Sequence, residues 1–241
     1  METTEDKLLG GKVIIIQPAK GYRVAIDPVL LAACVPAEAG QSVLDLGSGT
    51  GAASFCLRAR VNCRITGIEN NPDHLALSRQ SLEKNGWGKD VSFVEGNIQN
   101  PPPEIPMASF DWVMANPPYF NEAAYSASLT GKNAAHASAG GIAPWLECAA
   151  RFLKPSGWFF LIYPAEDEDV LAELNRVFRE IRILRVQPRA GEDSKRLLIA
   201  ASPSGRPVIA EAGSLILHED NGDYTEPAHA ILWDAKEIAI I

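Results

Sequence analysis

The chain has 241 residues, of which 46% are hydrophobic and 22% charged, and its formal net charge at pH 7 is -8. This composition is that of an ordinary globular protein with room for one large α/β domain or two small ones. It argues against a membrane protein, because the longest apolar runs, 13–16 and 158–163, are far shorter than the roughly 20 residues of a membrane span. The polar N-terminus lacks a signal-peptide pattern, so we expect a cytoplasmic protein.

The excess of acidic residues bears on partners, because nucleic-acid-binding proteins usually present a basic field to phosphate. Any contact with nucleic acid must therefore be local, through cations that can equally be scattered surface residues. The four cysteines contain no C-x-x-C pair and predict neither a metal site nor a disulfide framework. Nothing in the pattern indicates an oligomeric state.

The N-terminal residues 1–38 form an extension that precedes the part of the chain in which predicted strands and helices alternate. "KVIIIQPAKGYR" predicts a β-hairpin, and "IDPVLLAACV" predicts a helix that starts at Asp27 with Pro28 at its first position.

From residue 39 onward, β-rich runs alternate with helix-period segments. We expect strands at 42–46, 64–69, 91–95, 112–115 and 158–163, and helices at 51–59, 72–84, 144–153 and 169–181. Strands joined by crossover helices give a mostly parallel, doubly wound sheet. After residue 181, strands at 183–187 and 195–201 predict an antiparallel hairpin at one sheet edge. The economical organisation is a single domain, 1–241, with its core at 39–241.

The stretch "VLDLGSGTGA" places Asp45 at the end of the first core strand and Gly47, Gly49 and Gly51 in the turn that follows. Glycine lets the backbone adopt positive φ and lets a ligand approach closely. The same glycines also fit the G-x-G-x-x-A pattern of dinucleotide-binding proteins. Asp45 favours a different cofactor, because a carboxylate suits an ammonium and would repel a pyrophosphate. The run resembles motif I of the class I S-adenosylmethionine methyltransferases.

Further acceptors follow the next two strands. Glu69, with its neighbour Asn70, ends the second strand near the spacing of about 20 residues at which a ribose-binding acid is expected; an exposed acid at a helix start is the alternative. In the family that the glycine run resembles, the residue after the third strand meets the adenine of the cofactor, and Asn97 holds that position here.

The fourth strand ends in Asn116-Pro117-Pro118-Tyr119. Prolines cannot donate to a sheet ladder, so the strand must stop there. The four residues match the N-P-P-Y motif of methyltransferases that modify planar nitrogens. An adenine amino group that donates to the Asn116 side-chain oxygen and the Pro117 carbonyl can direct its lone pair at a methyl group, and the Tyr119 ring can stack on an unstacked base.

The N-terminal segment, the strand at 158–163 and the terminal hairpin are similar to those of the bacterial tRNA adenine-N6 methyltransferases that act on valine tRNA beside the anticodon. This resemblance covers most of the chain and implies a Rossmann-like class I methyltransferase fold with a seven-stranded sheet. It also implies that Gln17, Tyr22, Arg23 and Asp27 line the cofactor or target pocket; the alternative is that they only support the hairpin and the helix start.

The segment between residues 120 and 142 is rich in Ala, Ser and Gly and has no helical period. A long structureless stretch in a compact domain is usually functional or disordered. We interpret it as a lid over the target base, with Phe120, Lys132 and His136 near the substrate, and an exposed loop is the alternative. Arg189, in the turn of the terminal hairpin, is a further candidate for phosphate contact.

These patterns predict S-adenosylmethionine-dependent N6-methylation of an adenine in RNA, most simply tRNA. Three other nitrogens stay open: a protein glutamine amide, a DNA adenine and an rRNA guanine N2. Two functions of other classes also stay open, a nicotinamide-dependent dehydrogenase and a non-catalytic RNA-binding protein.

Overall fold

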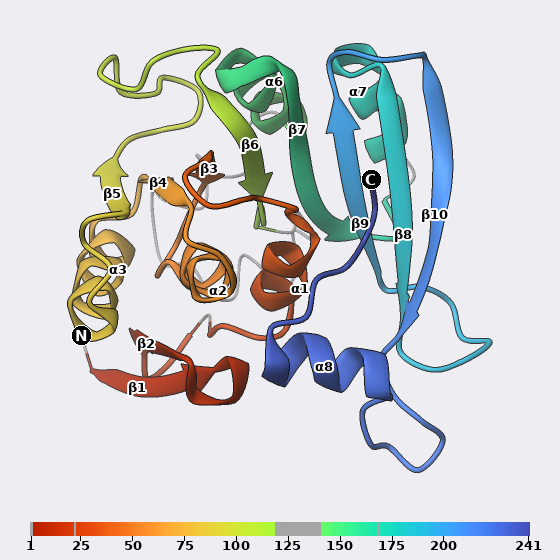
Figure 1. The fold of residues 1–241 in the computed structure, drawn as a ribbon, viewed down its shortest axis with the longest axis horizontal. Helices are drawn as coiled ribbons and strands as arrows, with labels where there is room; N and C mark the ends of the chain where they lie inside the picture. Colours follow the sequence, from red (N-terminus) through yellow and green to blue (C-terminus); the bar gives the residue numbers. More distant parts are fainter. Residues whose placement is uncertain (1, 22, 119–140, 168) are drawn as a thin grey trace.

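A twisted sheet of eight strands, in the order β10-β8-β9-β7-β6-β3-β4-β5, forms the centre of the molecule (Figure 1). The computed structural model describes residues 2–21, 23–118, 141–167 and 169–241. The sheet is formed by β3 (Ser42–Leu46), β4 (Arg64–Glu69), β5 (Val91–Glu95), β6 (Phe110–Ala115), β7 (Leu153–Pro164), β8 (Glu180–Gln187), β9 (Arg196–Ser202) and β10 (Val208–Ile216).

The strands β3 to β7 run parallel to one another, and β9 pairs antiparallel with both β7 and β8. The predicted bounds of β3, β4 and β5 are confirmed. Helices connect these strands: α2 (Ala52–Arg60), α3 (Pro72–Asn85), α6 (Ala143–Phe152) and α7 (Val170–Val177). The mostly parallel α/β class and its terminal antiparallel hairpin are therefore as predicted.

Two hydrophobic cores lie on opposite faces of this sheet. Successive strand residues alternate between them, so Met114 and Phe160 belong to one core while Val113 and Phe159 belong to the other. The first core packs against α1 (Asp27–Cys34), α2 and α8 (Glu226–Asp234), and the second against α6 and α7. The sheet is covered on both faces, as a doubly wound fold requires.

The sheet has eight strands where seven were expected, because β10 adds to the edge beside β8 in a parallel register. Most of its side chains are exposed and its register shifts between Glu211 and Gly213, so it shows no alternation of apolar and polar residues. The predicted helix 169–181 also extends too far. It ends at Val177, since Phe178 is already extended and Ile181 is buried within β8.

The N-terminal hairpin pairs β1 (Thr3–Leu8) with β2 (Val13–Pro18), so it starts earlier than predicted. Its turn lies at Leu9–Gly11, where Gly10 and Gly11 have φ of 61° and 95°. The hairpin is attached to α3: Ile14 N donates to Asn85 Oδ1 at 2.9 Å and Asn85 Nδ2 donates to the Ile14 carbonyl at 2.6 Å. The helix after it begins at Asp27 as predicted, although Ile26 and not Asp27 is its N-cap.

Segments distant in sequence meet around α1 and α8. Lys12 Nζ donates to the Trp233 carbonyl at 2.7 Å, and Ile238 N donates to the Ala33 carbonyl at 2.9 Å. The chain after α8 therefore lies against α1 (Figure 1). Among the described residues, none of the helices combines the length and the apolar character that crossing a membrane requires.

Candidate active site

The candidate site is at the carboxyl ends of β3, β4 and β6, which are neighbours in the sheet. In the register of these parallel strands, Leu46 is opposite Ala115 on one side and Ile68 on the other. The next residues along β3 and β6 are Gly47 and Asn116. The glycine turn and the start of N-P-P-Y therefore leave adjacent strands at the same edge, where ligands bind in open α/β sheets.

The three glycines of the turn have different surroundings. Gly47, Gly49 and Gly51 have φ of 63°, 56° and 89°, which favour glycine at each position. A Cβ on Gly47 would lie 2.5 Å from Cη2 of Trp145, and one on Gly51 would lie 2.6 Å from Cε2 of Phe55. A Cβ on Gly49 would have no neighbour within 4 Å among the described residues. Gly49 is thus the glycine at which the backbone faces open space.

Asp45 is a buried carboxyl group, 2% exposed, at the end of β3. Its Oδ2 accepts a hydrogen bond from Ser54 Oγ on α2 at 2.7 Å. Burial raises the pKa of Asp45 to about 7, the Ser54 hydrogen bond opposes this, and the negative charge of Glu69 adds to it. The site therefore holds a carboxylate that a cation would stabilise.

Glu69 is also buried, 6% exposed, at the end of β4. Its Oε2 accepts from Gly49 N and its Oε1 from Asn71 N, each at 2.7 Å. In the described part of the chain, no ion pair involves Asp45 or Glu69. Two buried acids with no basic partner among the described residues fit a ligand that carries an ammonium and vicinal hydroxyls, as S-adenosylmethionine does.

The other predicted cofactor residues lie on the turns after β4 and β5. Asn70 is exposed beside Glu69. Asn97 is exposed too, and its Oδ1 accepts from Gln99 N at 2.9 Å within a turn. Gly96 N, just before it, donates to the Glu69 carbonyl at 3.0 Å, so this turn is joined to the end of β4.

At the end of β6, Asn116 and Pro118 are half-buried and Pro117 is buried. Among the predicted substrate and pocket residues, Tyr22, Tyr119, Phe120, Lys132 and His136 lie outside the described residues.

Gln17 and Arg23 make their contacts within the N-terminal segment. Gln17, 3% exposed, donates to Asp6 Oδ2 at 2.9 Å and accepts from Val24 N at 2.8 Å. Arg23 forms an ion pair with the same Asp6 at 2.9 Å. These contacts are what the supporting role predicts for Gln17 and Arg23, and their role at the cofactor stays a prediction.

Asp27 and Arg189 each contact a residue of opposite charge in the C-terminal half of the chain. Asp27 Oδ2 accepts from Arg196 Nε at 3.0 Å, and Arg196 is opposite Pro164 at the carboxyl end of β7. The pair thus fastens the start of α1 to the edge of the sheet that holds the site. Arg189 is exposed in the β8–β9 turn and pairs with Glu192 at 3.5 Å.

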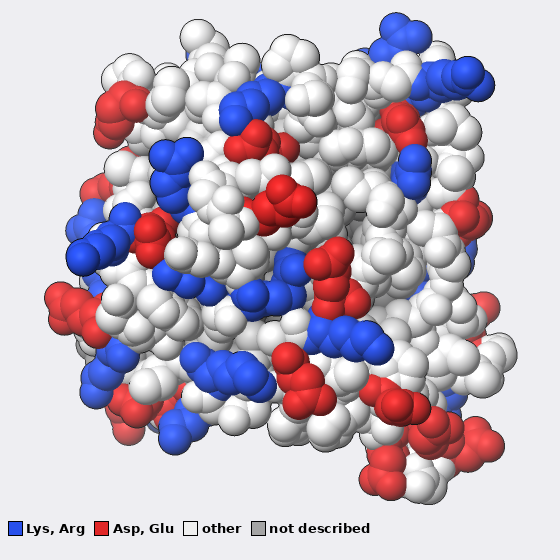
Figure 2. Space-filling view, in the orientation of Figure 1, with Lys and Arg blue, Asp and Glu red and all other residues white. Residues whose placement is uncertain are grey.

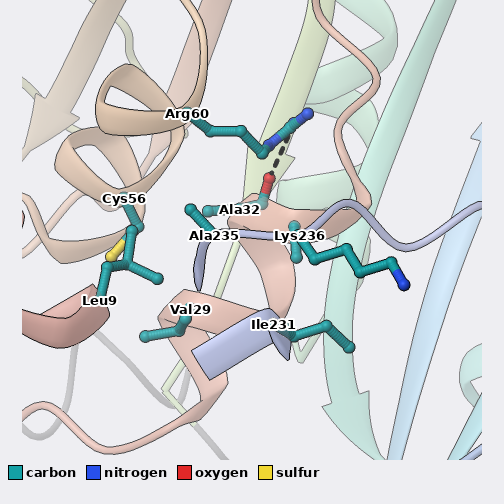
Figure 3. Close-up of a pocket in the computed structure, with 9 residues that line it drawn as sticks. Leu9, Val29, Ala32, Cys56, Arg60, Ile231, Ala235 and Lys236 are labelled. Carbon is teal, nitrogen blue, oxygen red and sulfur yellow. Dashed lines mark hydrogen bonds between the residues drawn. The ribbon is translucent and has the colours of Figure 1, made fainter. Parts of the chain in front are cut away.

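Two residues of the site were not identified from the sequence. Ser54 lies on the first turn of α2, where a hydroxyl facing back toward Asp45 could have been suspected from helical spacing. Trp145 lies on α6, and because it is far from Gly47 in sequence, no local pattern predicts that the two residues are in contact. A separate cavity of about 10 Å³ lies between α1, α2 and α8, and Arg60 Nη2 donates to the Ala32 carbonyl there at 3.2 Å. Figure 3 shows the residues that line it. The cavity has room for about one water and none for a cofactor.

The comparison with known families now decides between the cofactors that the glycine turn allows. A family model described as "Methyltransferase domain" matches residues 37–204. The chain belongs to this methyltransferase family. It is an enzyme that uses S-adenosylmethionine, and the dehydrogenase alternative is excluded. Asp45, Gly49 and Glu69 stay the predicted cofactor-binding residues of this site.

Relatives and solved structures agree with this assignment. The chain is similar to proteins named tRNA1(Val) (adenine(37)-N6)-methyltransferase: 27% identity to that of Histophilus somni, over 88% of this chain and 89% of the relative, and 26% to that of Haemophilus influenzae, over 88% and 90%. The structure of a predicted O-methyltransferase from Agrobacterium tumefaciens has a TM-score of 0.75 and 24% identity, covering 88% of this chain and 98% of that one. This likeness shows the same fold.

Among the described residues, no group of three or more His, Cys, Asp or Glu side chains could hold a metal ion.

Proposed function

We propose that this methyltransferase transfers a methyl group to N6 of an adenine in RNA, and that the RNA is a tRNA. The observation that carries the proposal is the adjacency of Gly47 and Asn116 at the ends of β3 and β6. A target nitrogen held by N-P-P-Y would then lie beside the turn that binds the methyl donor. When bound, S-adenosylmethionine supplies an electrophilic methyl group on a sulfonium.

The contribution of Asn116 and Pro117 is to orient the amino group of the base. The lone pair of an adenine N6 is delocalised into the ring, so the nitrogen is a weak nucleophile. The amino group can donate one N–H to the Asn116 side-chain oxygen and the other to the Pro117 carbonyl. These two hydrogen bonds favour a pyramidal nitrogen whose lone pair faces the glycine turn at residues 47–51, which we call the donor turn. Both oxygens also stabilise the positive charge that develops on the nitrogen. Burial of Pro117 keeps its carbonyl in a fixed place.

The contribution of the two acids is to hold the methyl donor. Asp45 is suited to the ammonium of the methionine part, and Glu69 to the hydroxyls of the ribose. Asn97, on the turn joined to Glu69, is suited to the adenine of the cofactor. These roles match the order in which the strands lie in the sheet, with β3 between β6 and β4.

The choice of RNA is supported by the names of the relatives, which are tRNA adenine-N6 methyltransferases. The net charge of -8 favours a different target, the glutamine amide of a protein, as the second candidate. Figure 2 shows lysine, arginine and acidic side chains interspersed on the visible face. RNA docking on such a face would rely on a few local cations.

A methyl-transfer assay on cell fractions separates these targets. Purified enzyme is incubated with tritiated S-adenosylmethionine and with tRNA, rRNA, DNA and protein from a strain that lacks the gene. The expected product is N6-methyladenosine in tRNA, identified by nucleoside analysis. Label found only in another nucleic acid would overturn the tRNA assignment, and label found only in protein would overturn the adenine assignment and support the glutamine target.

A further inference from the structure

Trp145 is the side chain that connects the donor turn to the second hydrophobic core. A Cβ built on Gly47 would lie 2.5 Å from Cη2 and 2.9 Å from Cζ3 of this ring. Cη2 and Cζ3 belong to the far edge of the indole, so the ring must reach the Cα of Gly47 across its full length. The rest of the half-buried ring packs against the core under α6.

The position of Trp145 is fixed by its helix. Pro144 lies in the first turn of α6, and Trp145 N donates to the Ile142 carbonyl at 3.0 Å. Leu146 and Ala149, on the same helix, are fully buried. The helix contacts both β3 and β6, the strands that lead to Gly47 and Asn116. The ring therefore forms a wall beside Gly47 that is carried by a packed helix.

The surroundings of the three glycines show which part of the donor turn the Trp145 ring borders. Gly51 is enclosed by Phe55 and Phe93 of the first core, whereas no described residue lies within 4 Å of a Cβ on Gly49. The ligand-accessible part of the turn is therefore bounded by Trp145 on the Gly47 side. That side lies nearest Asp45 and Asn116, and the proposed role of Asp45 assigns it to the amino-acid end of the donor.

We propose that Trp145 is a positioning residue for methyl transfer. It holds Gly47 in its left-handed conformation. It also aligns the sulfonium end of the donor with the oxygens of Asn116 and Pro117, which form the target clamp. The effect of Trp145 on Gly47 concerns cofactor binding alone and does not depend on the methyl acceptor. The alignment of the donor with the clamp rests on the proposed function of Asn116.

The test compares W145F with wild type and with W233F as the matched control. Trp233 is 40% exposed on α8, where its ring contacts Tyr224 and His229. Phenylalanine keeps the packing against the core but is too short to reach Gly47. Binding of S-adenosylhomocysteine is measured by calorimetry and by tryptophan fluorescence. We expect W145F to melt as a folded protein, to bind about tenfold more weakly and to lose most of the fluorescence change on binding. W233F should keep both signals.

A second variant makes the contact itself testable. G47A adds the Cβ that meets the ring, so it should weaken binding more in wild type than in the W145F background. Equal effects of G47A in the two backgrounds, or wild-type affinity and fluorescence response in W145F, would overturn the proposal. Because the ligand is the cofactor product, a wrong RNA assignment leaves this experiment unaffected. On the substrate that accepts the methyl group, W145F should lower kcat as well, whereas a purely structural tryptophan would leave kcat of the folded fraction unchanged.

Discussion

Glu69 connects the ends of two neighbouring strands, because its Oε2 accepts a hydrogen bond from the backbone N of Gly49 at 2.7 Å. The carboxylate that is suited to a ribose thus also fixes the donor turn. Its second oxygen, Oε1, accepts a hydrogen bond from Asn71 N. Cofactor binding must therefore share or exchange these backbone hydrogen bonds.

E69Q is expected to weaken binding of S-adenosylhomocysteine by about 10- to 100-fold, because hydrogen bonds to a charged group contribute about 1.5–3 kcal/mol. The matched control is E95Q: Glu95 is opposite Glu69 in the next strand but is exposed. Calorimetric titration of the two variants measures the difference. Equal affinities in E69Q and E95Q would contradict a role for the buried acid.

Asp45 predicts a pH dependence of cofactor binding. Its pKa is raised from 3.8 to about 7 by burial, and an ammonium binds the ionised form. Affinity should therefore rise as pH increases through about 7, and at one unit below the pKa it should be about tenfold lower than the plateau. D45N should bind weakly with this step removed. Titrations between pH 6 and 8 in both proteins measure it, and a step of the same size in D45N would assign it to another group.

Ionisation of Asp45 strengthens cofactor binding but lowers the stability of the enzyme without cofactor. A raised pKa means that the folded state holds this proton more tightly than the unfolded chain. The contribution of Asp45 is fully present below pH 3.8 and is lost as pH rises to about 7. Between pH 5 and 7, the melting temperature of wild type should fall relative to that of D45N. Parallel curves for the two proteins would contradict the assigned pKa.

Asn116 tests the proposed chemistry separately from binding. N116A should retain affinity for S-adenosylhomocysteine but lower methyl transfer by about 100-fold or more, as removal of one transition-state contact does. N116D keeps an acceptor oxygen and should retain more activity than N116A. N221A, at an exposed asparagine of another loop, is the control. Normal turnover by N116A would reject the clamp.

Gly51 tests the fold of the donor turn. G51A would force φ of 89° on alanine and would place a Cβ 2.6 Å from Phe55 and 2.8 Å from Phe93. We expect a loss of about 1–3 kcal/mol of unfolding free energy from overpacking and strain. Gly88 is exposed, and none of the described residues lies within 4 Å of a Cβ placed on it, so G88A is the control. Denaturant unfolding of both variants compares them, and equal stability would contradict the packing argument.

The sequence predicted β3, β4 and β5 to the residue because their runs are rich in β-branched and apolar residues and are bounded by turn signals. It missed β10, whose exposed side chains leave no pattern. The location of Asp45, Glu69 and Asn116 at the carboxyl ends of their strands followed from the predicted parallel topology, whereas the order of the strands came from the structure. Trp145 could not be predicted, because its contact with Gly47 arises from how α6 packs over two strands, which depends on side-chain shape and not on local pattern.

The hydrogen bond from Ile238 to Ala33 has a consequence for how the enzyme is made. During synthesis, α1 leaves the ribosome about two hundred residues before the partner that covers it. The helix that begins with Asp27 can therefore reach its final packing only after residue 238 has been synthesised. A nascent chain halted before residue 238 should already contain the donor turn and lack a settled N-terminal segment beside it.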